Sequence, residues 1–329
     1  SRLQAELADY IATRNWLDDT QPLFSIHHSP RKAFSVNTLT QHFHYLYRHA
    51  GVRGASSHSG RRSFITNLAS KGISVRVLAS LASQTLHKDF WELIVVDNAS
   101  TVLVILPQPW LAQAKLVQEK SLGLMQARLR GIQEAQGDLL IWVDDDNVLK
   151  PDYLELALEA FRINPCLGAA GGKSLPEYER TPPDWFTTNL APLGCRDLGE
   201  QSLLMNWDAE RPDYPSAAPI GAGLVIRRMA MVRWAEAVRT DPRRQQLGRR
   251  GTQLTSGEDN DICLTLLRAG WQLAYLPELS LTHLITAGRL QPDYLARIGR
   301  VSFRDFIWVL DMHGVRIWRP IAGWTLPLR

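Results

Sequence analysis

The sequence has few cysteines, no long apolar run and little net charge. Its three cysteines, Cys166, Cys195 and Cys263, stand far apart without CxxC spacing, which argues against a disulfide scaffold or a zinc site and fits a reducing compartment. No apolar run approaches the roughly 18–20 residues that cross a bilayer, and the N-terminus lacks the segments of a secretion signal. The sequence therefore predicts a cytoplasmic protein without a transmembrane segment.

The composition is that of a globular protein with a buried core. The chain has 329 residues, of which 45% are hydrophobic and 21% are charged, enough for one large domain or two ordinary ones. A net charge of +4 permits a polyanionic partner, such as nucleic acid or a nucleotide, without demanding one.

The residue pattern changes near residues 80 to 90. Upstream, apolar residues recur at helix spacing, and we identify no strand. Downstream, short apolar strands alternate with helices, which predicts a parallel α/β sheet; the segments are WELIVVD, LGLMQARLRGIQEAQG, DLLIWVDDD and PDYLELALEAFR. Residues 1–83 hold ten Lys or Arg against four acids, a balance typical of a DNA-facing surface.

The first segment contains an HxxR arrangement, His58 and Arg61, at the start of a predicted helix in HSGRRSFITNLASKG. Two such groups one turn apart can grip a phosphate and stabilise charge on it. Over roughly residues 3 to 82 the chain resembles the C-terminal part of the tyrosine recombinase (phage integrase) catalytic domain. The resemblance implies a domain at residues 1–82 in which His58 and Arg61 are remnants of a DNA contact.

Other elements of that family are missing. The family also has an earlier Arg and Lys, a GHS-like turn and a nucleophilic Tyr. Ala82-Ser83-Gln84 replace the turn, and no tyrosine lies between Tyr47 and Tyr153. Without a nucleophile no covalent DNA intermediate forms. We therefore expect no recombinase activity and at most weak binding of duplex DNA through residues 1–82.

The second segment ends an apolar strand in three aspartates, in IWVDDDNVLK. Carboxylates at a strand's carboxyl end can hold Mg²⁺ or Mn²⁺, which in turn binds a diphosphate, although an acidic cluster alone is more often a solvated turn. From about Gln84 to near Phe306 the chain resembles the family 2 glycosyltransferases, inverting enzymes that use nucleotide-diphospho-sugars. The resemblance implies a GT-A (Rossmann-like) α/β domain at residues 83–329, preceded by the mainly α-helical recombinase fragment.

The resemblance assigns roles to residues on the nucleotide side. Asp97 stands where the family contacts the base or ribose, and Gly123 and Arg128 match its G…AR element beside the nucleotide. In the DDDN motif, Asp144 and Asp145 are assigned to nucleotide binding. Asp146 is assigned to direct coordination of Mg²⁺ or Mn²⁺.

A second motif is SGEDNDICLTLLRAGW, where Glu258 and Asp259 match the family's catalytic ED pair. A carboxylate within reach of the acceptor hydroxyl can take its proton as the new bond forms. The alternative is N-capping of the following helix by Asp259 or Asp261. We assign Asp259 as the base and Asp261 as the cap.

Four further residues receive assignments from the resemblance. His283 falls where many GT-A enzymes place a third metal or diphosphate ligand, with Arg289 nearby to balance phosphate charge, although a lone His is more often structural. PIGAGLVIRR matches a strand and turn that border the acceptor. A tight turn that needs glycine is an equal alternative for Gly221 and Gly223.

Together these residues imply transfer of one sugar to an acceptor hydroxyl by a single displacement, with Asp259 activating the acceptor. The chain lacks the QxxRW motif of the processive polymerases. It also lacks the family's first strand, of the type VSVVIPTYNR, because recombinase-like sequence stands there. Losing a central strand leaves neighbouring edges unpaired, and we expect impaired nucleotide binding.

Two alternatives remain open. The first alternative to a glycosyltransferase is a DNA-binding, recombination-related protein whose glycosyltransferase part is incidental. The second is a non-functional product of gene fusion. The stretch VLASLASQTL suits both families' helices, so the sequence predicts that one helix continues through the join.

Overall fold

The computed structural model describes residues 25–26, 29–33, 75–101, 104, 114–188 and 191–317. The chain divides into two compact units, residues 1–68 and residues 69–329. The boundary expected between residues 82 and 83 stays a prediction. Within the described ranges no helix is both long and apolar enough to cross a bilayer.

The described part of the first unit is a small antiparallel strand pair. Strand β1, Ser25–Ile26, pairs with β2, Ser29–Ala33. The expectation of no strand upstream of residue 82 was therefore wrong. Strands of two and five residues are too short to show a clear alternation, so a search for periodicity overlooks them.

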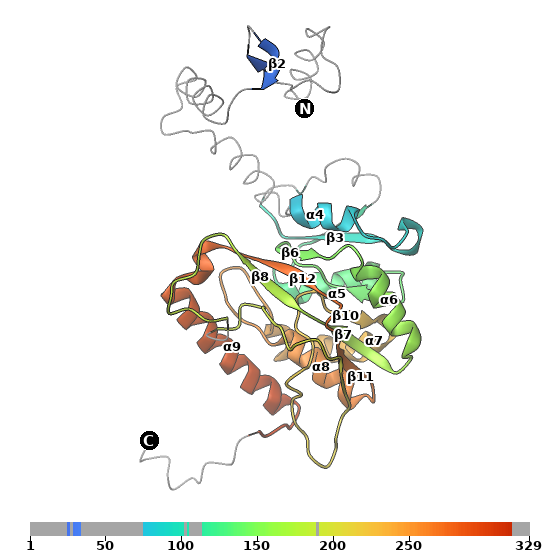
Figure 1. Ribbon diagram of the computed structural model, residues 1–329. Coiled ribbons are helices and arrows are strands. Elements are labelled where there is room, and N and C mark those ends of the chain that lie inside the picture. Colours follow the sequence, from blue (N-terminus) through green and yellow to red (C-terminus); the bar gives the residue numbers. More distant parts are fainter. Residues whose placement is uncertain are drawn as a thin grey trace. The chain divides into compact units, whose positions relative to one another are not determined.

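The second unit alternates strands with helices (Figure 1). Its strands are β3 (Leu93–Asn98), β4 (Ala114–Glu119), β5 (Leu139–Ile141), β6 (Asn147–Leu149), β7 (Leu167–Gly171), β8 (Ser174–Tyr178), β9 (Leu203–Met205), β10 (Val225–Arg227), β11 (Gln272–Tyr275) and β12 (Leu281–Ile285). Its helices are α4 (Val75–Ala82), α5 (Leu124–Glu134), α6 (Tyr153–Ile163), α7 (Arg228–Thr240), α8 (Glu258–Arg268) and α9 (Pro292–Met312), with 3-10 turns η1 (Lys88–Phe90), η3 (Arg244–Gln246) and η4 (Ala287–Leu290). The predicted strands and helices between residues 91 and 162 are confirmed, with shorter bounds.

The main sheet has five strands in the order β5-β10-β7-β11-β9. Only β7 and β11 pair in parallel, whereas β10 runs antiparallel to both β5 and β7, and β9 antiparallel to β11. The prediction of a parallel sheet was therefore wrong for most of its ladders. Among the described residues between β7 and β10 there is no α-helix, so β10 enters the sheet antiparallel to β7, without the helical crossover that parallel neighbours require.

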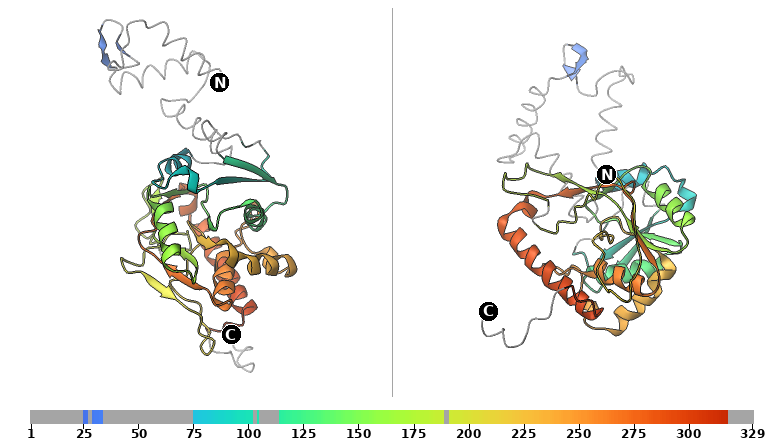
Figure 2. Two further views of the ribbon diagram at one scale, coloured as in Figure 1. Left: turned by 90° about the vertical axis from the view of Figure 1, so that its right-hand side faces the viewer. Right: turned by 60° about the horizontal axis from the view of Figure 1, so that its bottom comes forward.

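The two faces of this sheet are covered by different helices (Figure 2). Neighbouring residues of β10 point to opposite faces, as strand geometry requires: Ile226 packs with α7 and α8, and Val225 with α4 and α6. Both side chains are fully buried. The second unit is therefore a three-layer α/β/α arrangement, in agreement with the predicted α/β class.

Helix α4 belongs to the packing of this unit. Its buried side chains Val77, Leu78 and Leu81 join the core beneath α6. The Gln84 amide accepts a hydrogen bond from the Leu154 backbone N–H at 3.0 Å, which fastens the end of α4 to the start of α6. The helix at the join is α4, which packs within the second unit. The prediction that it continues through VLASLASQTL was wrong beyond Ala82, where α4 ends and a turn follows.

Two smaller sheets flank the main one, in the orders β6-β12-β8 and β3-β4. Among the described residues, β3 pairs with β4 alone and β5 with β10 alone. The apolar residues 93–96 of β3 stay partly exposed, unlike those of a central parallel strand. The expectation that the family's first strand is missing stays a prediction.

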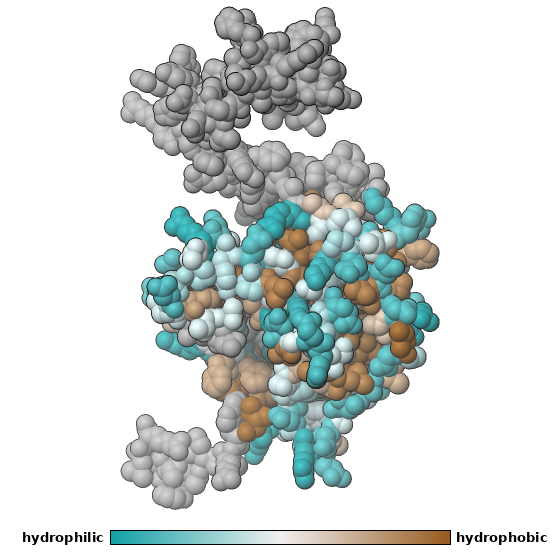
Figure 3. All heavy atoms as spheres, in the orientation of Figure 1, coloured by the Kyte–Doolittle hydropathy of each residue, from teal (hydrophilic) through white to brown (hydrophobic). Residues whose placement is uncertain are grey.

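The surface of this unit mixes side-chain types. On the face drawn in Figure 3, hydrophobic residues are interspersed among hydrophilic ones. Single exposed apolar side chains such as Ile163 and Met229 are ordinary for a globular protein.

Candidate functional site

The three aspartates form a turn between β5 and β6. The turn closes through the Asn147 N–H, which donates to the Asp144 carbonyl at 3.1 Å. The Asn147 side chain is fully buried and donates to the Asp146 carboxylate at 3.1 Å. The backbone and side chain of Asn147 therefore both stabilise the acidic turn.

The pairing of β6 with β12 brings His283 to the turn, since Asn147 lies opposite His283 in the ladder. Nε2 of His283 is 3.3 Å from the Asp146 carboxylate, and Arg289, in η4, reaches the same carboxylate oxygen at 2.8 Å. The structure thus brings Asp146 together with His283 and Arg289, which lie more than 130 positions further along the chain.

These contacts set the protonation of the group. Burial alone would raise the pKa of Asp146, but the hydrogen bond from His283 and the charge of Arg289 hold it below its usual value. Burial would lower the pKa of His283, whereas the hydrogen bond to Asp146 contributes to raising it to about 10. The resting site is an ionised carboxylate between two cations.

The other two aspartates are less well balanced. Burial raises the pKa of Asp144, and the charges of Asp146 and Asp145 raise it further against the opposing charge of Arg128. Burial and the charge of Asp146 likewise raise the pKa of Asp145. Three adjacent carboxylates therefore create a negative potential that a bound cation would relieve.

A divalent metal fits this site only in part. No group of three or more His, Cys, Asp or Glu side chains within the described ranges has the arrangement of a metal site. Asp146 and His283 form a pair of oxygen and nitrogen donors, which suits Mg²⁺ or Mn²⁺ when diphosphate and water complete the shell. Such binding would require Arg289 to release Asp146 and His283 to lose its proton.

The ED motif lies at the start of α8. Gly257 precedes the helix with φ +90°, in the left-handed region that favours glycine. The Asp259 carboxylate accepts a hydrogen bond from the Gly221 N–H at 2.9 Å, so the PIGAG segment, residues 219–223, helps to orient it. This supports a site role for Gly221.

Gly223 has a different role. Its φ is +68°, and a Cβ there would come within 2.5 Å of Leu281 and 2.7 Å of the Tyr153 hydroxyl. This is the tight, crowded turn of the alternative interpretation.

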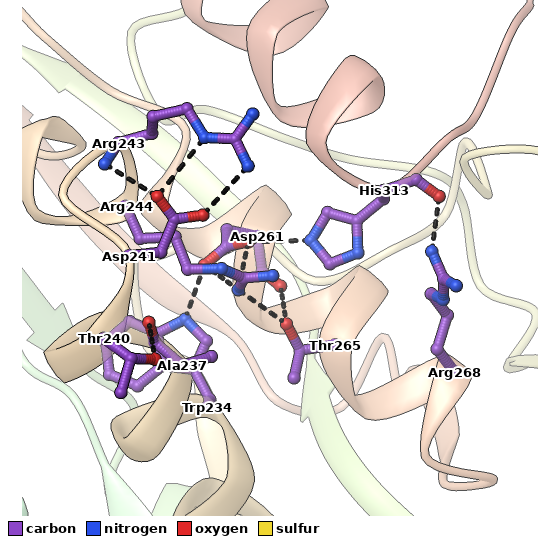
Figure 4. A network of polar contacts seen from close by, with 10 residues as sticks. All are labelled: Trp234, Ala237, Thr240, Asp241, Arg243, Arg244, Asp261, Thr265, Arg268 and His313. Atoms are coloured by element: carbon purple, nitrogen blue, oxygen red, sulfur yellow. Dashed lines mark hydrogen bonds and ion pairs between the residues drawn. The ribbon is translucent and has the colours of Figure 1, made fainter.

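Asp261 is not the cap that the sequence suggested. The N-cap position belongs to Gly257, without a side-chain hydrogen bond, and Asp261 lies in the first turn itself. Its carboxylate turns inward to Arg244, Trp234 and His313 (Figure 4). The prediction failed because it used position in the helix alone, whereas hydrogen-bond donors from other segments decided the orientation.

Glu258 and Arg128 form a buried ion pair. The Arg128 guanidinium lies 3.1 Å from the Glu258 carboxylate and stacks 4.1 Å from the ring centre of Trp142. Burial raises the pKa of Glu258 to about 7, although the charge of Arg128 acts in the opposite direction. Arg128 therefore holds Glu258, the residue next to the predicted base.

These groups surround one cavity of about 880 Å³. The predicted residues that line it are Arg128, Asp144, Asp145, Asp146, Gly221, Glu258, Asp259, His283 and Arg289. A volume of this size accommodates a nucleotide-sugar. The sequence motifs thus converge on a single cleft.

Two residues that the resemblance assigned to the nucleotide side, Asp97 and Gly123, do not line the cavity. Asp97, on β3, is buried, accepts a hydrogen bond from the Ser100 N–H and does not line the cavity. Gly123 precedes α5 with φ +137°, and its N–H donates to the Asn98 side chain. The role of Asp97 at the nucleotide rests on the resemblance alone.

The cavity also has a wall that the motifs did not indicate. Helix α9 contributes Tyr294, Ile298, Ser302 and Phe306, and the loop after η3 contributes Arg249. The spacing of 294, 298, 302 and 306 is one helical stripe, so the sequence held the signal. The sequence did not indicate, however, that this stripe faces the cavity.

The remaining predicted residues, His58 and Arg61, lie outside the described residues. Their assignment as remnants of a DNA contact stays a prediction.

Comparison with known proteins identifies related sequences. An N-acetylglucosaminyltransferase of Sinorhizobium fredii is 26% identical over 250 residues, which cover 71% of this chain and 55% of that protein. A glucosyl-dolichyl phosphate glucuronosyltransferase of Haloferax volcanii is 23% identical over 192 residues, covering 57% of this chain and 54% of that protein. The chain thus spans about half the length of these curated relatives.

Solved structures show a weaker likeness. The Staphylococcus aureus protein TarS, residues 1–349, in complex with UDP-GlcNAc is 16% identical, with a TM-score of 0.46 over 72% of this chain and 60% of that one. GalNAc-T7 with UDP, GalNAc and Mn²⁺ is 17% identical, with a TM-score of 0.46 over 71% of this chain and 44% of that one. Similarity at this level is too low to support a statement about the cleft.

A family model matches part of the chain. The model described as Glycosyl transferase family 2 covers residues 75–203, which is less than half of the sequence. The match begins at the first residue of α4 and includes the acidic turn, but ends before the ED motif. Residues 75–203 are therefore similar in sequence to the glycosyl transferase family 2 domain.

Proposed function

We propose that the second unit is an inverting, metal-dependent glycosyltransferase of the GT-A type. The observation that carries the proposal is the shared cleft, in which the acidic turn with His283 and the ED pair line one cavity. The family match of residues 75–203 and the names of the curated relatives support the same reaction class. The substrate is a nucleotide-diphospho-sugar, and the acceptor carries a hydroxyl group.

In this reaction the acceptor oxygen attacks the anomeric carbon while the bond from that carbon to the diphosphate oxygen breaks. Asp259 takes the proton of the acceptor hydroxyl as the new C–O bond forms. The Gly221 N–H donates to one Asp259 oxygen and the Asn260 N–H to the other, both at 2.9 Å, and these two contacts orient the carboxylate. One displacement inverts the configuration at the sugar carbon without a protein nucleophile.

The leaving diphosphate requires positive charge. Arg289 and Arg128 line the cavity, and both can lie beside phosphate oxygens. A divalent ion held by Asp146 and His283 would supply further charge neutralisation. Mg²⁺ and Mn²⁺ both suit these donors.

The decisive experiment incubates the full chain with a panel of UDP- and GDP-activated sugars, Mn²⁺ or Mg²⁺, and simple hydroxyl acceptors. We expect metal-dependent release of nucleoside diphosphate. Asp259→Asn should lower turnover by about 10²–10⁴-fold, the size typical of a lost general base. Asp293→Asn, an exposed acid on α9, is the control and should leave turnover unchanged.

Two results would count against the proposal: release of nucleotide that is indifferent to EDTA, or equal turnover in the Asp259→Asn variant. The missing strand leads us to expect donor affinity weaker than micromolar, which isothermal titration with UDP or GDP and Mn²⁺ measures directly.

The recombinase-like segment supports a separate and weaker expectation. Residues 1–82 should bind duplex DNA weakly, with an affinity that falls as salt increases. The double variant His58→Ala, Arg61→Ala should reduce this binding in a fluorescence anisotropy titration. Equal binding by the variant would remove these two residues from any DNA contact.

A further inference from the structure

Asp261 is a fully buried carboxylate outside the reaction itself. Its oxygens accept hydrogen bonds from Trp234 Nε1 at 2.8 Å and from His313 Nε2 at 2.7 Å. Arg244 donates to both oxygens, at 2.6 and 2.8 Å. Figure 4 shows Asp261 at the centre of these groups. It does not line the cleft, so substrate contact does not account for it.

The cluster balances the charge of Asp261 within the core. A buried carboxylate without partners carries a large desolvation cost, whereas here one guanidinium and two N–H donors surround it. Trp234 and His313 are themselves buried, and the Arg244 side chain is 13% exposed. The interaction is therefore shielded from solvent and strongly directional.

The three partners come from three separate segments. Trp234 lies in the middle of α7, Arg244 begins η3, and His313 is the C-cap residue of α9. Two of these segments continue into the cleft wall, because the chain after η3 reaches Arg249 and α9 supplies the stripe of residues 294, 298, 302 and 306. Asp261 thus joins α8 to the walls of the cleft.

Helix geometry relates Asp261 to the proposed base. At about 100° per residue, two positions along α8 differ by about 200°, so Asp259 and Asp261 point to opposite sides of the helix. Asp259 faces the cleft and accepts from Gly221, while Asp261 faces the core. Any rotation of this first turn that displaced Asp261 would turn Asp259 away from its position.

A second line of contacts ends at the same residues. Arg128 stacks on Trp142, whose ring centre lies 6.5 Å from that of Trp234, the donor to Asp261. Arg128 also pairs with Glu258, the first residue of α8. The first turn of α8 is therefore held at Glu258 from the cleft and at Asp261 from the core.

From this geometry we infer that Asp261 is a positioning residue: held by Arg244, Trp234 and His313, it sets the orientation of the first turn of α8 and hence of Asp259. The inference rests on the proposed function for the role of Asp259, but the geometric part stands without it. His313 is the partner best suited to a test, because its side chain contacts Asp261 through one atom and it is not among the residues that line the cleft.

The experiment compares His313→Ala with His313→Gln, whose side-chain amide can restore an N–H donor to Asp261. Asp311→Asn, an exposed acid near the same helix end, is the matched control. Turnover of a UDP- or GDP-sugar, affinity for UDP and GDP with Mn²⁺, and hydrogen exchange of the backbone are measured for each full-length variant.

We expect His313→Ala to lower kcat at least tenfold with nucleotide affinity within threefold of the parent, and His313→Gln to recover kcat to within threefold. Exchange should rise in residues 256–263 and at Gly221 in the Ala variant but not in the Gln variant. Unchanged kcat in an active chain, or an exchange increase spread evenly over α7, α8 and α9, would overturn the inference.

If the parent chain turns over no nucleotide-sugar, the proposed function fails by itself. The exchange measurement then decides the positioning role, since a local increase in residues 256–263 with recovery by Gln supports it and a uniform increase refutes it.

Discussion

The acidic turn of residues 144–146 and the Asp261 cluster treat buried negative charge in opposite ways. Asp261 has a donor for each oxygen and a guanidinium beside it. In the turn, Asp146 forms ion pairs with His283 and Arg289, whereas burial raises the pKa of Asp144 and Asp145 despite the cations near them. The balanced carboxylate holds the fold together, whereas the unbalanced ones are where a cation or a nucleotide complex would lower the free energy.

The largest effect on stability is expected from removing the Asp261 carboxylate, whose charge is balanced by Arg244. Asp261→Ala leaves Arg244 buried without its carboxylate, and removal of one partner from a buried ion pair costs about 3–5 kcal/mol. Urea denaturation followed by tryptophan fluorescence measures this loss. A cost below about 1 kcal/mol would show that the cluster is dispensable.

The second prediction concerns ligand binding at the unbalanced side. Mn²⁺ with UDP or GDP, at 100 times its Kd, should stabilise the folded chain by about 2.7 kcal/mol, seen as a rise in Tm. Asp146→Ala should abolish this rise, because it removes the anionic ligand. Asp241→Asn, a surface acid paired with Arg243, provides the control. A ligand-induced rise of equal size in the Asp146 variant would place the metal elsewhere.

The third prediction concerns how the free energy of unfolding depends on pH through Glu258, which lies outside the Asp261 cluster. Because the pKa of Glu258 is raised from 4.5 to about 7, the folded state binds this proton more tightly than the unfolded state. Its contribution to stability is present below about pH 4.5 and is lost as the pH rises through 7.

Glu258→Gln removes that contribution, so its free energy of unfolding should fall about 1–3 kcal/mol less than that of the parent between pH 4.5 and 7.5. Denaturation at several pH values measures the difference. Parallel curves for the two proteins would contradict the raised pKa.

The smallest effect on Tm is expected from removing one charge of the acidic turn, residues 144–146, in the absence of metal and nucleotide. Asp145→Asn removes a carboxylate whose charge is unfavourable next to Asp146, so it should raise Tm by about 1–2 °C. Differential scanning calorimetry without metal resolves such a shift. A lower Tm would show that the charge of Asp145 is already balanced.

Much of the site could be predicted because its residues lie in short local motifs. The three aspartates end a strand, and Glu258 and Asp259 begin a helix, so the sequence places both at element ends where side chains are exposed to a cleft. The convergence of these motifs on one cavity depends on sheet pairing. His283 reaches Asp146 only because β12 pairs with β6.

The errors have a common origin in long-range packing. Asp261 was read as a helix cap because capping preferences are local, but Arg244 and His313 compete for the same carboxylate more strongly. The sheet was read as parallel because strands alternate with helices, but β10 enters antiparallel after a long connection. Neither the partners of Asp261 nor the antiparallel pairing of β10 can be recognised within a window of a few residues.

The sequence by itself determined the α/β class of the second unit, the acidic turn, the ED pair and the helix over Val75–Ala82, because periodicity and motif spacing are local properties of the chain. Tertiary structure alone decided which carboxylates face a cleft and which face a balancing cation. It did so because the free energy of a buried charge depends on every group within a few ångströms, and those groups come from segments far apart along the chain.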